Sequence, residues 1–393
     1  YLEERAIEAY GNYYSIHWPG AENEAGRGLR RSPLHEHLKA AGAVFGARFG
    51  FERPLCFPDP GAGRKEIPSF EDKPSWFDQV AKEHRQIREG VALIDQTSFC
   101  KFTIEGPGAT AFLDTNCANR IAGEPGRCIY TTMLNERGGV EAEVTLLHLA
   151  PERFVMISGS AFGVRDSNWV RRHLPDGSPI ALTDVTSGWA VLNLCGPRSR
   201  EVLQSVSDDD LTNAAFPFLA VRDIEVGPVP VRAVRVGYVG ELGYELHVPT
   251  DYAAMLYDTL KPAGEPYGIR DVGYRAIETC RLEKGYVYWS AEIGPDYDPL
   301  SAGLDWAVAF GKDFIGKSAL LDVQKNGPLR RLCLFTIDGF APLLGGEAIL
   351  KEGQVVGQTA SCGYGHTLGL TIAFGWLPAA LAKETDFEIE AYG

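Results

Sequence analysis

The sequence predicts an α+β fold that ends in a small antiparallel β-domain. The 393 residues are 45% hydrophobic and 23% charged, which is typical of a globular protein with a large core. Segments with helical and with alternating periodicity are interspersed from residue 76 to about residue 310. Beyond Gly311, short strand-like segments separated by glycine turns dominate. The length predicts two or three domains.

The composition argues against several classes of function. Lys and Arg number 38 and Asp and Glu number 52, so the net charge is −14 and nucleic acid is a poor candidate ligand. No apolar run approaches the ~20 residues of a membrane span. The cysteines are scattered without a CxxC pair, which favours reduced thiols in the cytoplasm, or in the mitochondrial matrix of a eukaryote.

Residues 1–75 are expected to precede the main body rather than to fold alone. Helix-like segments at 2–10 and 34–41 are separated by turn residues, and the stretch from Phe57 to Pro74 is rich in proline and glycine. That stretch predicts a connection and a boundary near residue 75. The chain opens at Tyr1 with neither Met nor an apolar signal core, which predicts a further segment upstream.

The main body is expected to span residues 76–325. A helix begins at Trp76 and ends at Gly90, residues 92–105 alternate as one strand would, and a short helix follows Pro107. Further strands are predicted at 129–134, 144–149, 154–158, 189–194, 224–229 and 231–236, with a helix at 162–173. A last helix follows Thr250, with one face formed by Tyr252, Met255, Leu256 and Leu260.

Residues 326–393 are expected to form a separate β-domain. Short strands are predicted at 332–337, 347–350, 354–357, 372–377 and 387–390. Their spacing suits a small antiparallel barrel or a sandwich.

One motif points to a different class of protein. Residues 311–318, GKDFIGKS, satisfy the P-loop pattern GxxxxGK(S/T), which cradles nucleotide phosphates. Phe314 and Ile315 are bulky where such a cradle needs small residues, and the alternating strand–helix pattern of nucleotide-binding folds is missing. We therefore expect Phe314 and Ile315 to anchor a helix and Lys317 to be structural.

Hydrolase and metal chemistry have little support. Ser160 misses the GxSxG nucleophile elbow by one position. The histidines are dispersed without the spacing of metal ligands, so no metal is expected.

Two glycine-punctuated segments carry the acidic residues of greatest interest. Residues 237–247 place Glu245 beside aromatic residues at a strand–turn–strand junction. A plain hairpin would explain them, but a carboxylate beside aromatics also suits a heteroaromatic ring with several N–H donors, such as a pterin. In residues 134–144, period-2 alternation places Glu141 and Glu143 on the side opposite the valines. A solvated strand edge and a functional cluster both remain open.

Four motifs occur in the order and at the spacing of one family. They are MLNERGGV at residues 133–140, YVGELGYE at 238–245, CRLEKG at 280–285 and DFIGK at 313–317. In these motifs the chain resembles the folate-binding aminomethyltransferase family, whose type member is the T-protein of the glycine cleavage system. Other segments resemble the join between the flavin and folate domains of dimethylglycine and sarcosine dehydrogenases, at residues 1–5, 17–19, 32–34 and 42–46.

The resemblance implies a three-part folate-binding body with a central tunnel, closed by a C-terminal antiparallel β-barrel. It also implies roles for five residues. Glu143 lies where the family has its catalytic aspartate and is one methylene longer, and Tyr238 resembles the active-site aromatic. Glu245 resembles the acid that anchors the pterin, Phe99 an apolar wall residue, and Arg281 a contact for polar atoms of the cofactor.

The function implied is tetrahydrofolate-dependent methylene transfer in an FAD-linked N-methylglycine demethylating dehydrogenase or oxidase. An iminium and tetrahydrofolate would give 5,10-methylenetetrahydrofolate, and FAD would lie in an upstream flavin-binding domain or subunit. Residues 1–75 would then be the tail of the flavin-domain region and a linker, 76–325 the folate-binding domain and 326–393 the barrel. Two alternatives stay open: a stand-alone aminomethyltransferase or folate-dependent demethylase, and a regulatory homologue without turnover, like the pyruvate dehydrogenase phosphatase regulatory subunit.

Overall fold

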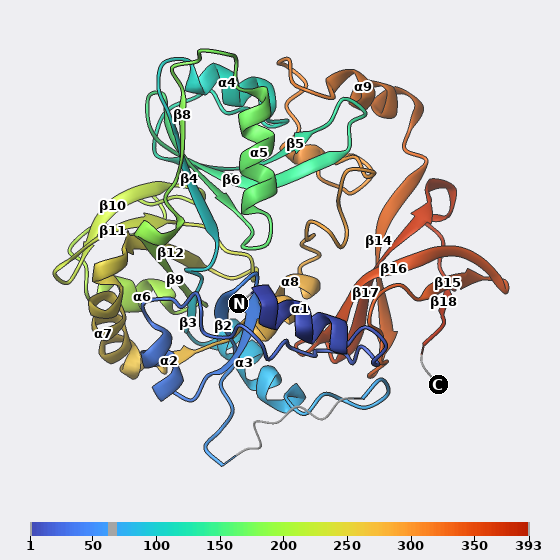
Figure 1. Ribbon diagram of the computed structural model, residues 1–393, viewed down its shortest axis with the longest axis horizontal. Helices are drawn as coiled ribbons and strands as arrows, with labels where there is room; N and C mark the ends of the chain where they lie inside the picture. The colour runs from blue at the N-terminus through green and yellow to red at the C-terminus, as the bar shows by residue number, and fades with distance from the viewer. Residues whose placement is uncertain (1, 62–68, 392–393) are drawn as a thin grey trace.

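The computed structural model describes residues 2–61 and 69–391. Three large sheets surround the middle of the molecule, and helix α8 (Tyr274–Glu283) lies near their meeting point (Figure 1). The described residues do not include Tyr1, the central part of the predicted connection after Phe57, or Gly393 at the end of the predicted C-terminal domain. In the part of the chain that is described, no helix has the length and apolar character needed to cross a bilayer.

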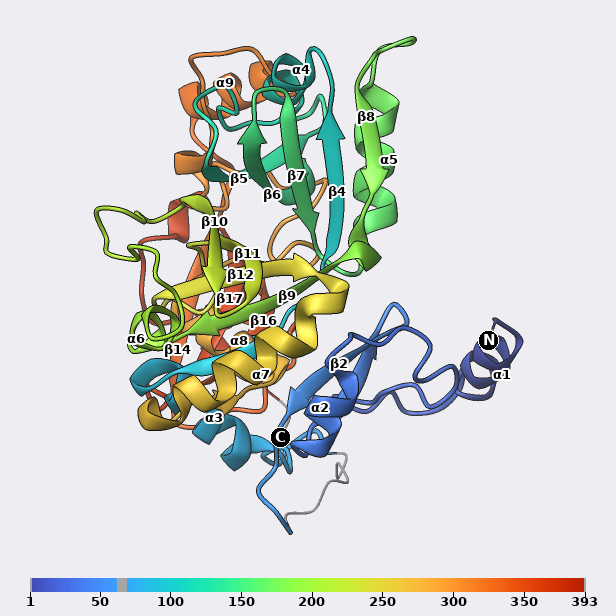
Figure 2. The same ribbon diagram turned by 90° about the vertical axis from the view of Figure 1, so that its left-hand side faces the viewer.

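The N-terminal region carries two helices and a hairpin. Its elements are α1 (Leu2–Gly11), α2 (His35–Ala40), β1 (Val44–Arg48) and β2 (Phe51–Cys56). Helix α1 buries no residue and stands away from the rest of the molecule (Figure 2). Leu34, Leu38 and Ala43, by contrast, pack into the core of the first large sheet. The boundary near residue 75 stays a prediction.

The first sheet has the strand order β10-β11-β12-β9-β3-β13. Its strands are β3 (Ala92–Asp95), β9 (Trp189–Cys195), β10 (Val221–Val226), β11 (Val229–Val234), β12 (Gly243–Pro249) and β13 (Arg270–Asp271). Helices α3 (Phe77–Glu89), α6 (Ser199–Gln204) and α7 (Ala253–Gly264) accompany it. On β12, Tyr244 and Leu246 point into the apolar core, so alternation turns Glu245 to the opposite face. That face looks toward the second sheet, because Val234, paired with Glu245, packs against residues of that sheet.

The second sheet has the order β5-β6-β7-β4-β8. Its strands are β4 (Cys100–Glu105), β5 (Arg127–Leu134), β6 (Val140–Ala150), β7 (Arg153–Ser158) and β8 (Ala181–Asp184), and its helices are α4 (Ala109–Asn116) and α5 (Gly163–His173). Residues 92–105, predicted as one strand, form two strands in different sheets. The Asp95 carboxylate accepts a hydrogen bond from Thr97 N at 3.0 Å, and this turn ends β3.

The third sheet is antiparallel, with the order β14-β17-β16-β15-β18. Its strands are β14 (Arg330–Asp338), β15 (Ala348–Lys351), β16 (Gln354–Gly365), β17 (Leu370–Pro378) and β18 (Glu388–Ile389). The five predicted strands are confirmed, although β16 extends well beyond Gly357 because it stays paired with β17 to Gly365. The α+β class with an antiparallel C-terminal domain is therefore confirmed.

Two smaller expectations are resolved by packing. Met255 is 47% exposed, so the prediction that it shares a helix face with Leu256 and Leu260 is wrong. Leu256 and Leu260 define the buried face of α7, and Met255 lies one residue to the side of it. Phe314 is buried, as expected, just before helix α9 (Lys317–Asn326). Lys317 pairs with Asp313 at 3.0 Å. The short 3₁₀-helices span Thr186–Gly188, Thr250–Tyr252, Glu265–Tyr267, Asp305–Ala307 and Ala379–Leu381.

Candidate functional site

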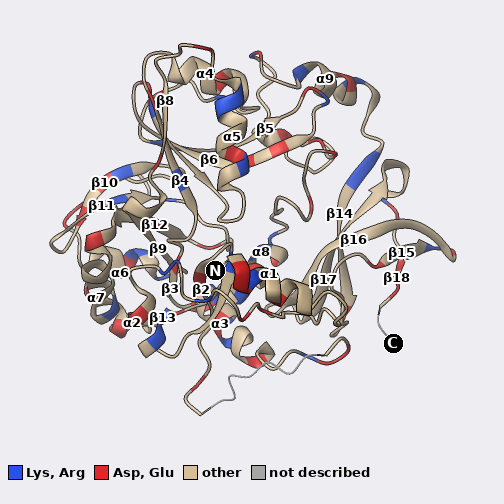
Figure 3. Cartoon of the chain, in the orientation of Figure 1, with Lys and Arg blue, Asp and Glu red and all other residues tan. Residues whose placement is uncertain are grey.

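The central group of polar residues is built around Glu143 on β6, a strand whose acidic positions are coloured in Figure 3. Glu143 Oε1 accepts a hydrogen bond from Tyr130 Oη at 2.8 Å, and Oε2 accepts one from the backbone N–H of Trp289 at 3.1 Å. The Trp289 indole donates to Val140 O at 2.9 Å. Glu143 is thus held from its own hairpin and from a loop that follows α8.

The neighbouring turn brings this loop close to β6. A Cβ at Gly139 would lie 1.8 Å from Pro295 O, so only glycine allows the two backbones to approach. Val140 N donates to both Gly294 O and Tyr297 O at 3.0 Å. The glycines of the predicted turn therefore serve a contact between distant segments.

Burial changes the acidity of this group. Desolvation raises the pKa of Glu143 to about 7, although the Tyr130 and Trp289 hydrogen bonds oppose that rise. The pKa of Tyr130 lies well above its usual value because of burial and the adjacent carboxylate. Glu143, Tyr130 and Tyr238 are each only partly buried, so a small part of each side chain remains open to solvent or to a ligand. A carboxyl group with a pKa near 7 can both hold and release a proton at neutral pH.

Tyr238 meets the same loop. Its hydroxyl donates to Val287 O at 2.5 Å, and its ring stacks on Tyr286 with centroids 5.8 Å apart. We call residues 286–293 the central loop, since this loop contacts both Glu143 and Tyr238. The two predicted catalytic residues are therefore brought together through a segment that neither motif contains.

Arg281 lies beneath the central loop and is fully buried. Its guanidinium donates to Tyr286 O at 3.0 Å and to Glu292 Oε2 at 3.2 Å, and it also pairs with Glu278. These contacts hold Arg281 inside the protein. Its role as a direct cofactor contact stays a prediction.

Glu245 lies on the polar face of the first sheet, directly opposite Asn193 on β9. Its side chain is 20% exposed, and Oε2 is 3.4 Å from Nε2 of the buried His247. Burial lowers the pKa of His247, which keeps this imidazole neutral near pH 7. Glu245 is thus partly accessible, with the His247 imidazole beside it and the charge of buried Lys101 near enough to interact with it.

Phe99 lies in the link between β3 and β4. The ammonium group of buried Lys101 donates to Phe99 O at 2.7 Å and to Thr97 O at 2.9 Å, which fixes the shape of this link. Desolvation lowers the pKa of Lys101 to about 8. Within residues 2–61 and 69–391, no hydrogen bond or ion pair joins Phe99 or Glu245 to the Glu143 group.

Three residues of the central group were not found from the sequence: Tyr130, Trp289 and Glu292. Tyr130 had a usable signal, because Thr132 pairs with Glu143 and Tyr130 is two residues along the same strand face. Trp289 and Glu292 had none, since they come from a loop far along the chain.

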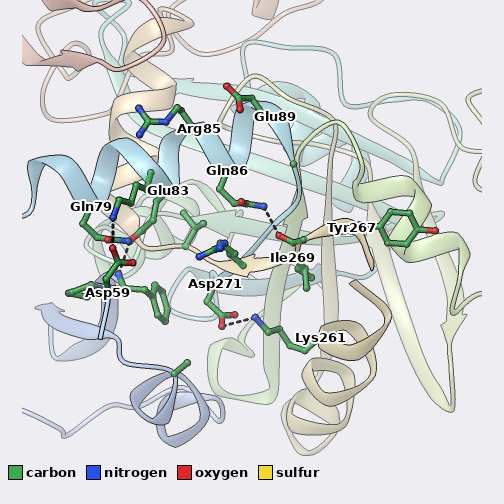
Figure 4. A pocket seen from close by; sticks show the side chains of 18 of the residues that line it. Asp59, Gln79, Glu83, Arg85, Gln86, Glu89, Lys261, Tyr267, Ile269 and Asp271 are labelled. Atoms are coloured by element: carbon green, nitrogen blue, oxygen red, sulfur yellow. Dashed lines mark hydrogen bonds and ion pairs between the residues drawn. The ribbon is translucent and has the colours of Figure 1, made fainter. Parts of the chain in front are cut away.

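A separate cavity of about 770 Å³ opens between α3 and the loop before β13 (Figure 4). Lys261 and Asp271 form an ion pair of 2.9 Å on its wall, and Gln86 donates to Gly268 O. Cationic and anionic side chains are balanced around it, and none of its lining residues belongs to the Glu143 group. The side chains predicted to be functional lie elsewhere.

Comparisons with known proteins agree over the whole chain. Residues 34–312 match the GCVT N-terminal domain, residues 330–393 the glycine cleavage T-protein C-terminal barrel domain, and residues 1–32 the FAD dependent oxidoreductase central domain. The chain is 35% identical over 396 residues to 4-methylaminobutanoate oxidase (formaldehyde-forming) of Paenarthrobacter nicotinovorans, covering all of this chain and 48% of that protein. It is 36% identical over 400 residues to mitochondrial dimethylglycine dehydrogenase of Mus musculus, covering 100% and 46% respectively.

The chain therefore spans about half the length of these relatives. Among solved structures it is similar to the glycine cleavage system aminomethyltransferase T from Bartonella henselae, with a TM-score of 0.78 and 26% identity. That match covers 93% of this chain and 94% of the other.

Proposed function

The chain belongs to the glycine cleavage T-protein family, and we propose that it is the tetrahydrofolate-dependent methylene-transfer module of an FAD-linked N-methylglycine demethylating dehydrogenase or oxidase. Two relatives that match its full length are named as enzymes that oxidise N-methyl amines. Because the match covers only half of each relative, the flavin chemistry is assigned to the remaining half. The substrate class proposed is dimethylglycine or sarcosine.

Support comes above all from the placement of Glu143. It lies where three sheets meet, with a pKa of about 7 and two donors that fix its orientation. A carboxylate on a solvated strand edge would have neither property. This arrangement favours the functional interpretation of the second acidic segment.

The residues fit a reduced pterin. Glu245 offers a partly exposed carboxylate, and one carboxylate can accept two parallel N–H groups from an aminopyrimidinone ring. Asn193 lies opposite it on the same sheet face. Tyr238 and Tyr286 provide stacked aromatic surface near Glu143. Phe99 adds apolar surface from the β3–β4 link, as proposed.

Bound tetrahydrofolate supplies the two nitrogen atoms, N5 and N10, that share the one-carbon unit in the product. The overall reaction of the iminium with tetrahydrofolate gives 5,10-methylenetetrahydrofolate, one proton and the demethylated amine, which is secondary from dimethylglycine and primary from sarcosine. Glu143 accepts that proton on a carboxylate oxygen, while Tyr130 Oη and Trp289 N keep the carboxylate in place. The surrounding aromatic side chains limit the access of water, which would otherwise convert the iminium to formaldehyde.

The proposed partner is a flavin-binding domain or subunit. Residues 1–32 match part of an FAD-dependent oxidoreductase, and α1 presents Leu2, Ile7 and Tyr10 with exposures of 79%, 66% and 85%. Exposed apolar side chains on one short helix suit a protein contact. We propose that residues 1–75 are the tail of the flavin-domain region and a linker, that residues 76–325 form the folate-binding domain, and that residues 326–393 form the barrel.

Three measurements test the proposal on the purified chain. Tetrahydrofolate at about a hundred times its Kd should stabilise the fold by roughly 2.7 kcal/mol in a thermal melt, whereas ATP should not. With formaldehyde and a secondary amine as iminium source, methylenetetrahydrofolate should form faster than in the uncatalysed condensation. The chain alone should not oxidise dimethylglycine or sarcosine. Folate binding without transfer would favour the regulatory homologue, and a melt that responds to ATP but not to folate would favour the P-loop hypothesis.

A further inference from the structure

Glu292 is a completely buried carboxylate in the central loop, and distant segments converge on it. Oε2 accepts hydrogen bonds from Tyr288 N at 2.7 Å and from Arg281 Nη1 at 3.2 Å. Oε1 accepts one from Ser361 N of β16 at 3.0 Å. The backbone oxygen of Glu292 accepts from the Trp376 indole of β17 at 3.2 Å. One residue thus ties the loop to α8 and to the third sheet.

The contacts of Glu292 fix the position of a central loop that contains a strained residue. Ser290 has φ of +81°, a backbone conformation that is costly for a residue with a side chain. Within the loop, backbone hydrogen bonds run from Ser290 N to Ile293 O at 2.9 Å, and from Ala291 N and Glu292 N to Tyr288 O at 3.2 and 3.1 Å. These bonds close a turn at residues 288–293, and the contacts of Glu292 with Arg281, Ser361 and Trp376 fix where that turn lies.

Adjacent peptide groups connect Glu292 to Glu143. The N–H of Tyr288 points to Glu292, and the N–H of the next residue, Trp289, points to Glu143. Only φ and ψ of Tyr288 lie between these two planar peptides, so a displacement of the first is passed to the second unless those two angles compensate.

We propose that Glu292 is a positioning residue, an inference that rests on the proposed function. It acts through the central loop to keep the Trp289 N–H on Glu143, and it thereby couples the third sheet to the transfer site. In this role Glu292 does not itself touch the reacting atoms. The third sheet is then part of the support of the site as well as a cover.

The charges around Glu143 give this role a distinct signature. The groups that face it or the loop beside it are Tyr130 from β5, Glu141 from β6, Arg165 from α5 over the Trp289 ring, Tyr238 from the β11–β12 link, Arg281 from α8 and Glu292. The Trp289 hydrogen bond lowers the pKa of Glu143 and the charge of Glu292 raises it, the hydrogen bond being the larger influence. Losing the Trp289 hydrogen bond should therefore raise the pKa of Glu143, whereas losing only the charge of Glu292 should lower it.

The test compares E292Q with E278Q in the full chain. Both variants remove a carboxylate that pairs with Arg281, but Glu278 is half-exposed, and among the described residues no hydrogen bond or ion pair joins its side chain to the central loop. In E292Q the amide N–H₂ must face a donor, so the loop shifts. We expect the transfer rate to fall on the order of ten- to a hundredfold with folate affinity within about twofold of the parent, and E278Q to transfer within about twofold of the parent.

Two further readouts separate positioning from loss of stability. The pH at which transfer reaches half its maximum should rise in E292Q, and E292Q should add little to the defect of E143Q. The proposal would be overturned if the pH midpoint of E292Q fell or stayed fixed. It would also be overturned if the rate defect of the double variant equalled the product of the two single defects. If E292Q does not fold, E292D keeps the charge but shortens the reach, and the same midpoint rise is required of it.

The outcome for the parent separates this inference from the function on which it rests. A parent that neither binds folate nor transfers would refute the proposed function. A parent that transfers, with E292Q behaving as E278Q does, would refute the positioning role alone.

Discussion

Glu143 and Glu245 both lie on strands that face the middle of the molecule, but the protein holds them differently. Glu143 is bound by Tyr130 and Trp289 and has a pKa of about 7. Glu245 is 20% exposed and has the neutral imidazole of His247 3.4 Å away. The first environment suits a group that exchanges a proton, and the second suits a carboxylate that receives N–H groups from a ligand. The same side chain is thus prepared for two tasks by its neighbours.

The largest expected effect is that of E143Q. The substitution keeps size and most hydrogen bonding but removes the base, so transfer should fall by ~10²- to 10⁴-fold while folate still binds. In a system that includes a flavin-bearing partner, amine oxidation should be little changed and more free formaldehyde should appear.

The matched control for E143Q is E141Q. Glu141 lies on the same strand face, but its Oε1 accepts from Asn135 Nδ2 at 3.0 Å in the adjoining turn. Its rate should stay near that of the parent. Equal transfer by both variants would mean that the general base lies elsewhere, and the contrast between the two glutamates would lose its meaning.

The next effect is that of E245Q, measured as folate affinity by calorimetry. Hydrogen bonds to a charged group contribute about 1.5–3 kcal/mol, so affinity should fall by roughly ten- to a hundredfold. At saturating folate the transfer rate should stay near that of the parent, because the base is intact. A loss of rate at saturation with unchanged affinity would reverse the roles assigned to the two glutamates.

A smaller effect is expected for Y130F, measured as the pH dependence of transfer. Glu143 acts as a base when ionised, so the parent rate should rise with pH through about 7. Removing the Tyr130 hydroxyl takes away a donor that stabilises the ionised form, so the midpoint should move to higher pH. At pH 7 this gives a several-fold lower rate that recovers in alkali. A midpoint that does not move would show that Tyr130 does not act on Glu143.

The smallest effect is expected for K317A, outside both regions. Lys317 pairs with an Asp313 carboxylate that is 98% exposed, and such pairs add little to stability. Unfolding free energy should change by no more than about 0.5 kcal/mol, and transfer should persist. Nucleotide binding by the parent that disappears in K317A would instead support the P-loop hypothesis.

The local pattern determined much of the fold and one side of the site. Alternation placed Glu141 and Glu143 opposite the buried Val140, Ala142 and Val144, because side chains on a strand alternate between faces. The C-terminal strands were found from their length and their glycine turns. The same alternation misled at residues 92–105, where the Asp95 turn directs the chain from one sheet to another without interrupting the pattern.

Only the tertiary structure decided what holds Glu143. Trp289 is 146 residues away along the chain, and its contribution is a backbone N–H that every residue except proline possesses. The close approach of Gly139 to Pro295 and the contacts of Glu292 with α8 and β16 likewise join distant segments. Periodicity reports which face a residue occupies on its own element. It carries no information on which loop will cover that face, because that depends on how separate sheets pack together.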